Sequence, residues 1–337
     1  MALKKTTQDV RCPGWLETQL LAHRNRHGPH YQGFLSDHLP MAMLAMHALG
    51  DRRPQLEAYA DSYRARLDAP VQHATEPPNT YAEAIGDLSS YGALLSYFDR
   101  EIAGQGVRGT LCRFLPALIS GWVRFAFHPV IRLAYGIRFG VESEVAAGLA
   151  YLTCAGPDDT LLALAESAPR RSKLTLPGPA TVDEAPFEQR NNATVASGAL
   201  TSHVAVVPDN RRVVAELGLA LFNATHDFFA LHVVTGTHAL GVCADAIGLD
   251  VDGLLSAGVL AAYVTIGAPP FDAQATPTPT RIDDEHDAKM AFSCLDQARR
   301  LCSRRFEEAA TIYAPPQFGP QTGRHGAGPQ TCREHGS

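Results

Sequence analysis

Apolar and polar residues recur along most of this chain with the period of a helix. Pro40 opens a short apolar run that stops at Gly50, and proline at the start with glycine just past the end is typical of a helix. Asp283 or Asp284 can cap a last helix that reaches about Ala309. The other runs with helical spacing cover residues 54–68, 81–102, 111–123, 130–151, 211–222 and 227–247. The pattern therefore predicts a mainly α fold.

The segments between these runs contain turn residues and little that alternates like a strand. Residues 168–192 are rich in proline, arginine and acids and are expected to form a surface loop or a lid, residues 271–280 form an irregular connector, and 204–207 is one candidate strand. The sequence contains neither βαβ alternation nor a glycine-rich nucleotide motif. We expect a single large helical domain over residues 1–312 and a disordered tail over 313–337.

Composition narrows the class of protein. The chain has 337 residues, of which 45% are hydrophobic and 19% charged, which is typical of a globular protein. Its net charge of -6 and the lack of a dense basic run argue against a nucleic-acid partner. Seven cysteines without a C-x-x-C pair do not indicate a disulfide framework. The first ten residues lack the apolar segment of a secretory signal, so we expect a cytoplasmic protein.

Two stretches are apolar enough to raise the question of a membrane. They cover Phe114–Ile137 and Val213–Leu249, and both contain several ionisable side chains. Such side chains are costly in the hydrocarbon of a bilayer. We therefore expect no membrane association, and predict that both stretches are buried core helices lining a polar cavity.

Five histidines lie in apolar stretches close to helix starts or inside helices: His38, His128, His232, His238 and His286. A buried histidine costs free energy unless its ring nitrogens are bonded. Taken singly, each can be explained by a bond to the backbone. Several of them reaching one interior point would instead supply the imidazole ligands that Fe, Zn or Cu use in proteins. The sequence therefore predicts a buried, histidine-lined cavity.

The segment around His128 adds polar candidates. His128, Arg132 and Tyr135 share one face of a regular helix, because four and three residues separate them. Pro129 favours an extended conformation for His128, which places it at the mouth of the helix. We expect Arg132 and Tyr135 to bond substrate or oxygen, and a structural pair between Arg132 and a carboxylate is the alternative.

His232 and His238 lie six residues apart on one predicted helix. They are separated by about 9 Å along the axis and by about 120° around it, so binding one metal together would need a bulge near Gly236. An arrangement in which one of the two histidines binds the metal and the other supports it requires less distortion of the helix. We predict that His238 orients a ligand or bonds the substrate.

His286 and Lys289 share a helix face, as two metal ligands do in carboxylate-bridged helical bundles. A cationic lysine is a poor ligand, but a buried neutral one can react with CO2 to form a carbamate with carboxylate-like oxygens. A solvated Lys289 paired with nearby acids is the alternative. Glu285 and Asp287 leave the helix at other angles than His286, so we do not expect either of them to serve as the anionic ligand.

Two other classes of function remain open. His203, the pair His226-Asp227 and Asp245 occur in the order that resembles helical metal-dependent phosphohydrolases, although no basic residues cluster there to hold a phosphate. A non-catalytic helical binding protein is the second alternative. Convergence of His203 and His226 with the two acids would favour the hydrolase, and absence of a bound transition metal would favour the binding protein.

Four short segments together resemble the questin oxidase-like family. They are H-L-P-M-A at His38, F-H-P-V-I-R-L-A-Y at His128, L-H-V-V-T-G-T-H-A-L at His232 and D-D-E-H-x-x-K at His286. They occur in the order of the family and span residues 38–289. The resemblance implies a helical non-haem iron oxygenase that opens the ring of anthraquinones, with several histidines and a carbamylated lysine on the metal.

On this resemblance we expect Fe(II) to be held by the metal set His38, His128, His232, His286 and carbamylated Lys289. The sequence does not decide which four of the five histidines are ligands. The expected partners are a small aromatic, quinone-like substrate and O2, with NADPH as a candidate external reductant. The choice between monooxygenase and dioxygenase and the oligomeric state stay open.

Overall fold

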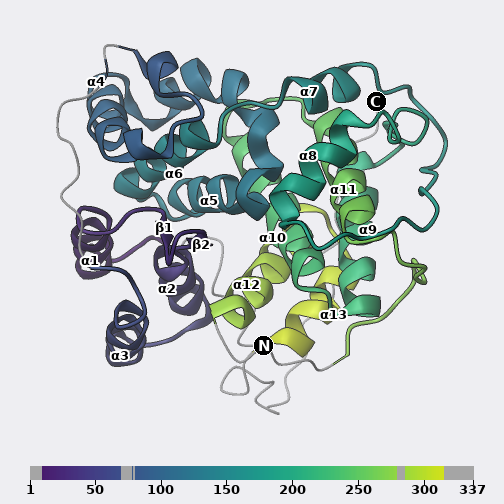
Figure 1. Cartoon of the computed structure of the whole chain (residues 1–337). Helices are drawn as coiled ribbons and strands as arrows, with labels where there is room; N and C mark the ends of the chain where they lie inside the picture. The colour runs from purple at the N-terminus through teal and green to yellow at the C-terminus, as the bar shows by residue number, and fades with distance from the viewer. Residues whose placement is uncertain (1–9, 70–77, 79, 279–284, 315–337) are drawn as a thin grey trace, which may run out of the picture.

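The computed structural model describes residues 10–69, 78, 80–278 and 285–314, and these form a mainly α-helical domain (Figure 1). The first part contains α1 (Gly14–Arg24), β1 (His30–Tyr31), β2 (Leu35–Ser36), α2 (Leu39–Leu49), α3 (Arg53–Arg64), 3-10 turns at Tyr81–Ala84 and Leu88–Ser90, and α4 (Tyr91–Leu118). A 3-10 segment at Ile119–Phe127 leads into α5 (His128–Phe139), α6 (Glu142–Ala155), α7 (Asp159–Glu166) and α8 (Phe187–Ala196). The last part contains α9 (Asn210–Thr225), α10 (Phe228–Ile247), α11 (Asp252–Thr265), α12 (Glu285–Arg300) and α13 (Arg304–Tyr313).

Several helices begin and end where the sequence predicts. Helix α2 has Pro40 in its first turn, and Gly50 ends it with a left-handed φ of 105°, a conformation that glycine adopts without strain. Asp227 caps α10, because its side chain accepts hydrogen bonds from the backbone N–H groups of Phe229 and Ala230. The predicted mainly α fold is confirmed.

The run over residues 130–151 is two helices rather than one. Gly140 adopts a φ of 68° and turns the chain between α5 and α6, which then pack side by side. Two glycines allow this close packing: a Cβ on Gly148 would lie 2.4 Å from the backbone of Leu133, and one on Gly136 would lie 2.5 Å from that of Val145. The hydrophobic pattern continues through Gly140 because both helices are buried, so the turn is not visible in it.

The small amount of strand lies elsewhere than the sequence predicts. Residues 204–207 form only an isolated bridge between Val206 and Arg170, whereas β1 and β2 pair as a short antiparallel hairpin. Within residues 168–192 the chain is largely irregular until α8 begins at Phe187, and residues 271–278 are irregular as predicted. The candidate caps Asp283 and Asp284 and the tail beyond residue 314 lie outside the described residues.

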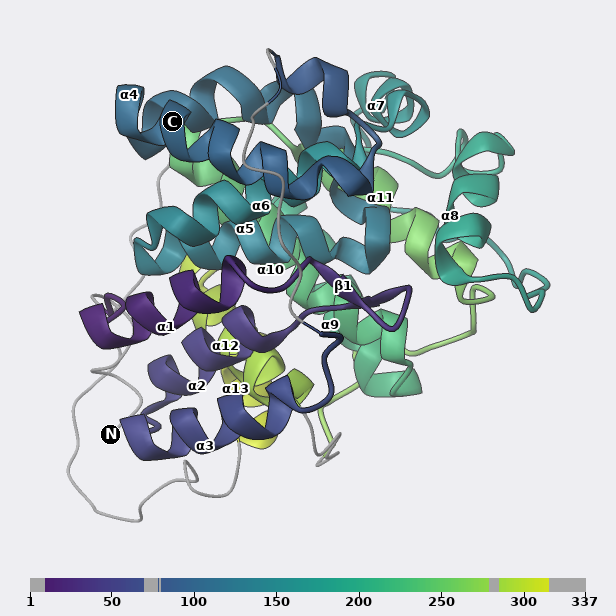
Figure 2. The ribbon, with the colours of Figure 1, turned by 60° about the vertical axis from the view of Figure 1, so that its left-hand side comes forward.

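Helix α10 lies near the middle of the molecule, with α5 on one side and α9 and α11 on the other (Figure 1). Helix α12 packs against α10 and against α2, and the turned view in Figure 2 shows α1, α2 and α3 gathered at that end of the molecule. Four helices from distant parts of the sequence (α2, α5, α10 and α12) therefore come together around one interior point.

Two helical stretches are long and apolar enough to cross a membrane by length and composition. They cover Leu88–Phe139 and Phe228–Ile247, and 72% and 78% of their most apolar windows are buried inside the molecule. Burial to this extent is what the core helices of a folded domain show, so these stretches are weak evidence for a membrane.

Candidate metal centre

Four of the five histidines lie together, each in the N-terminal turns of a different helix. His38 immediately precedes α2, His128 is the first residue of α5, His232 lies in the second turn of α10 and His286 is the second residue of α12. The ring centroid of His38 lies 4.6 Å from that of His128 and 4.6 Å from that of His286. The ring centroid of His232 lies 4.8 Å from that of His128 and 5.1 Å from that of His286. The four imidazoles thus surround one point.

The nitrogen atoms of this cluster have the spacing that a metal requires. One ring nitrogen from each of His38, His128 and His232 lies within 4.8 Å of the others, and all three side chains are buried. Nitrogens that bind one metal at about 2.0–2.2 Å lie at most about 4.4 Å apart. A contraction of a few tenths of an ångström would bring these three onto one ion.

Backbone carbonyls fix two of the rings. The Nδ1–H of His128 donates to the Phe125 carbonyl at 2.6 Å, and the Nδ1–H of His232 donates to the Phe228 carbonyl at 2.8 Å. These bonds select the tautomer that leaves Nε2 as an acceptor. The Nε2 atom of His128 is buried and has no hydrogen-bond partner among the described residues, which is costly unless a ligand binds there. The residues present therefore fit a metal ion.

The chain before His128 is strained. Phe125, Ala126 and Phe127 all have left-handed φ angles of 48°, 50° and 69°, a conformation that costs about 1–3 kcal/mol for each residue. The turn places the Phe125 carbonyl against the His128 ring and buries Phe127 against Gly236, where a Cβ would lie 2.7 Å from the phenyl ring. His128 sits at the mouth of the helix as predicted, but its φ of -59° and ψ of -38° are helical, so the extended conformation expected before Pro129 is wrong.

Burial and nearby charges favour the neutral form of three of the imidazoles, those of His38, His128 and His286. Burial, followed by the positive charge of Lys289 among other nearby groups, lowers the pKa of His38 well below its ordinary value. Burial and neighbouring histidines do the same for the pKa of His128, and burial lowers the pKa of His286 to about 2. Neutral imidazole is the form that binds metal ions. These three histidines are therefore in the protonation state that a metal ligand needs near neutral pH.

Lys289 lies inside the cluster. Its side chain is 1% exposed, and its Nζ lies 3.2 Å from Nδ1 of His38. This burial rules out the solvated lysine that was the alternative. Asp37, next to His38 in sequence, points away from the cluster, because its carboxylate bonds Nε2 of His23 at 2.7 Å.

Glu285 lies beside the imidazole cluster, although the sequence did not indicate it as a site residue. It is 7% exposed, its Oε1 lies 3.5 Å from Nδ1 of His38, and one oxygen lies within 4.8 Å of ligand nitrogens of both His38 and His286. Glu285 was not expected to serve as a ligand, because it leaves α12 at another angle than His286. It nevertheless lies beside the cluster, because His38 approaches from α2 on the side where Glu285 lies.

The three predicted catalytic residues lie outside this cluster. Arg132 donates from Nε to Glu144 at 2.8 Å with both side chains buried, which is the structural pair considered as the alternative. Tyr135 packs between aromatic rings, with its centroid 5.4 Å from Phe292 and 6.4 Å from His238. Their roles in binding substrate or oxygen stay predictions.

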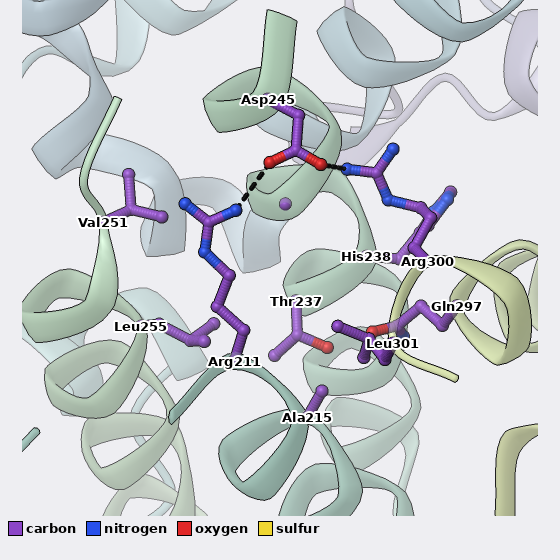
Figure 3. A pocket seen from close by; sticks show the side chains of 11 residues that line it. Arg211, Ala215, Thr237, His238, Asp245, Val251, Leu255, Gln297, Arg300 and Leu301 are labelled. Atoms are coloured by element: carbon purple, nitrogen blue, oxygen red, sulfur yellow. Dashed lines mark hydrogen bonds and ion pairs between the residues drawn. The ribbon is translucent and has the colours of Figure 1, made fainter. Parts of the chain in front are cut away.

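His238 belongs to a different polar group on α10. Its Nε2–H donates to Asp296 at 2.9 Å, and Asp296 also accepts from Arg138 at 3.0 Å. His238 also lines a separate cavity of about 80 Å³ between α9, α10 and α12 (Figure 3). With α10 regular around Gly236, His232 alone reaches the cluster from this helix.

The residues of the phosphohydrolase alternative are dispersed. Figure 3 shows Asp245 held between Arg211 and Arg300, each of which forms an ion pair with it. Asp227 caps α10, and the ring of His203 bonds the carbonyl of Thr175. Among the residues that the structure describes, these side chains form no group that could hold a metal.

Phe228 covers the solvent side of the cluster. Its ring centroid lies 4.6 Å from that of His232 and 5.0 Å from that of His286, yet 48% of the residue is exposed. It is thus an aromatic surface that contacts both the imidazoles and the solvent.

Comparison with known proteins gives related sequences. A questin oxidase of Aspergillus terreus is 31% identical over 127 residues, which is 34% of this chain and 28% of that protein. A Baeyer–Villiger oxidase of Paecilomyces divaricatus is 27% identical over 157 residues, 42% of this chain and 34% of that protein. A Baeyer–Villiger monooxygenase of a Cryptosporiopsis species is 27% identical over 127 residues, 34% of this chain and 28% of that protein.

The aligned segments thus span about a third of the length of these curated relatives. The model of the questin oxidase-like family matches residues 35–210, just over half of this chain, and that range contains His38 and His128. The chain belongs to the questin oxidase-like family.

Proposed function

We propose that this protein is a non-haem iron-dependent oxygenase that oxidises or opens an aromatic, quinone-like polyketide with O2. The observation that carries the proposal is the set of buried imidazoles from His38, His128 and His232 whose nitrogens face one point. Membership of the questin oxidase-like family, with relatives named as questin and Baeyer–Villiger oxidases, supports the oxidative chemistry.

In this proposal His38, His128, His232 and His286 hold the metal together with Lys289. The Lys289 amine would combine with CO2, releasing one proton and gaining an anionic carbamate. That charge would partly offset the ferrous charge in a dry interior. Iron bound there would supply the one-electron and O2 chemistry that amino-acid side chains lack.

The chain itself would bind and orient the substrate and exclude water. The exposed ring of Phe228 offers a planar aromatic compound a surface on which to stack beside His232 and His286. The apolar packing behind the imidazoles keeps the site dry, which strengthens electrostatic interactions inside it. Arg132, Tyr135 and His238 would act through the packing of α5, α10 and α12.

The balance of atoms separates the two kinds of oxygenase. A monooxygenase inserts one oxygen atom and needs two electrons and two protons, for which NADPH is the candidate donor, to reduce the other atom to water. A dioxygenase that cleaves the ring places both atoms in the product and balances without electrons from a reductant. Isotopic labelling with ¹⁸O2 and the requirement for NADPH therefore decide between them.

The test combines metal analysis with oxygen uptake. Protein purified without chelators is expected to contain iron, and to consume O2 when an anthraquinone is added under conditions that support turnover. His128→Ala is expected to lose both properties, whereas His203→Ala, outside the cluster, keeps both. Protein that binds no transition metal even after anaerobic incubation with Fe(II) would favour the non-catalytic helical binding protein.

A further inference from the structure

A carboxylate adjoins the imidazole cluster without any chemical modification of the chain. Glu285 is the first residue of α12, and its oxygen atoms face the other helices rather than solvent. Together with His38 and His286 it forms a second group with the spacing of a metal site, and His38 is shared with the three-histidine group. The two groups therefore describe one centre with an oxygen atom on the α12 side.

We propose that Glu285 is an anionic ligand of this metal centre and that Arg66 is the residue that positions it. The inference rests on the proposed function, because it assumes that the histidine cluster holds a metal. It adds a ligand that neither the histidine motifs nor Lys289 provides.

The charge of the site supports an anionic oxygen there. The four histidines come from the N-terminal turns of four helices, and the N-terminus of a helix carries a partial positive charge. Four neutral imidazoles leave the charge of a divalent metal uncompensated in a buried site. A carboxylate is the side chain that compensates it, and iron in proteins commonly combines histidine and carboxylate ligands.

The carboxylate of Glu285 has a cationic partner at the edge of the site. Arg66 forms an ion pair with its Oε2 at 3.1 Å, and the Arg66 side chain is partly exposed to solvent. The cost of burying this charge is met by Arg66 in the metal-free protein.

Arg66 and Tyr63 contact the two sides of the site, Glu285 on α12 and His38 before α2. Arg66 donates to Oε2 of Glu285 at 3.1 Å, which leaves Oε1 facing His38. The same guanidinium lies 4.3 Å from the centroid of the Tyr63 ring. The hydroxyl of Tyr63 accepts the backbone N–H of His38 at 2.8 Å. One short segment at the end of α3 therefore contacts both the carboxylate and the start of α2.

The roles of Glu285 and Lys289 can be separated by their dependence on CO2. A carbamate on Lys289 forms only when CO2 is present, whereas the carboxylate of Glu285 is permanent. Removing CO2 therefore tests the carbamate alone, and replacing Glu285 tests the carboxylate alone. If both groups bind the metal, each change alone lowers the affinity for the metal.

The experiment measures the affinity for Fe(II) and Co(II) under anaerobic conditions, with and without CO2, in wild-type protein and in variants. The variants are Glu285→Gln, Glu285→Ala and Arg66→Met. Glu307→Gln is the matched control, because Glu307 is an exposed acid in the first turn of α13. Thermal unfolding of each metal-free variant shows that it is folded. Absorption bands of the Co(II)-loaded protein report the ligand set independently of activity.

We expect Glu285→Gln and Glu285→Ala to lower the affinity for both metals by at least about tenfold, with and without CO2, and to shift the Co(II) bands. Arg66→Met is expected to have a smaller effect in the same direction, and Glu307→Gln none. If Glu285→Gln keeps the wild-type affinity while Glu285→Ala lowers it, Glu285 is not a metal ligand. The amide oxygen of glutamine can still accept a hydrogen bond from His38, so that result would indicate a hydrogen bond instead. Unchanged affinity in both variants, in a wild-type protein that binds iron, would overturn the inference and leave the proposed function intact. Wild-type protein without metal affinity would overturn both.

Discussion

Nζ of Lys289 lies 3.2 Å from Nδ1 of His38, although 251 residues separate the two in the sequence. Oε1 of Glu285 lies 3.5 Å from the same nitrogen, so the groups proposed to bind the metal lie on the Nδ1 side of this ring. An imidazole nitrogen binds a metal only when it carries no proton, and a protonated lysine amine beside it would repel a divalent cation. A metal-loaded site with this geometry therefore requires a neutral or carbamylated Lys289.

Replacing Lys289 tests this requirement directly. Lys289→Ala is expected to lose most of its iron and its activity, because the anionic carbamate is removed. Lys289→Glu is expected to recover part of the metal binding with a shorter reach. Metal content by mass spectrometry and its dependence on CO2 are the measurements. Normal iron content in Lys289→Ala would contradict the assigned role.

The two histidines of α10 are expected to respond differently to replacement. His232→Ala removes an imidazole whose ring lies among the other three, and should lower the metal affinity by more than about tenfold. His238→Ala removes the partner of Asp296 and should lower turnover while leaving most of the iron bound. Metal content and turnover of both variants are compared. Loss of all metal in His238→Ala with full retention in His232→Ala would reverse the two roles.

The pair of Arg132 and Glu144 is expected to contribute to stability. Both side chains are buried, so Glu144→Leu or Arg132→Met alone leaves a charge without its partner. Each single change should lower the free energy of unfolding by about 3–5 kcal/mol. The double variant, which removes both charges, should lose less than the sum. Denaturant unfolding of the metal-free proteins measures all three, and additive losses would contradict the pairing.

The parts of this site that were predicted from sequence are those with a strong local signal. A histidine within an apolar run stands out, so His128, His232 and His286 could be singled out, and the spacing of three linked His286 to Lys289. The positions of Arg132 and His238 depend on acids of other helices, Glu144 on α6 and Asp296 on α12, and no pattern within one helix indicates these pairings.

Glu285 could not be predicted because its role depends on how two helices meet. Within α12 its direction differs from that of His286, but α2 brings His38 to the side where Glu285 lies. The strained backbone at Phe125 and Phe127 could not be predicted either, because phenylalanine does not indicate a left-handed backbone conformation. The β1–β2 hairpin was missed because two-residue strands are too short to alternate.

Phe228 is expected to control access to the cluster. Phe228→Ala removes a half-exposed ring that contacts His232 and His286, so a chelator should reach the metal faster. Lost stacking should raise KM for an aromatic substrate by about 2- to 10-fold, with a smaller effect on kcat. Leu21→Ala, which shortens another partly exposed apolar side chain on α1, is the control. Equal rates of metal removal in wild type and Phe228→Ala would contradict the covering role.

The free energy of unfolding of the metal-free protein is expected to decrease as the pH falls from about 6.5 to about 5, because of the buried histidines. The pKa values of His38 and His128 lie well below the ordinary value of 6.5, and that of His286 is about 2, chiefly because of burial. Between about pH 5 and pH 6.5 the unfolded chain takes up protons that the folded cluster does not, so the free energy of unfolding decreases as pH falls.

Each such histidine contributes a slope of up to about 1.4 kcal/mol per pH unit below pH 6.5. His30, whose pKa is lowered to about 4 by burial, acts in the same direction. The contribution of the cluster is therefore isolated by comparing wild type with His128→Gln, whose slope should be smaller by up to that amount. Urea unfolding at pH 7.5, 6.5 and 5.5, with metal removed, gives both slopes. Stability that is independent of pH over this range would show that the imidazoles become protonated in the folded state, and would argue against a buried cluster ready to bind metal.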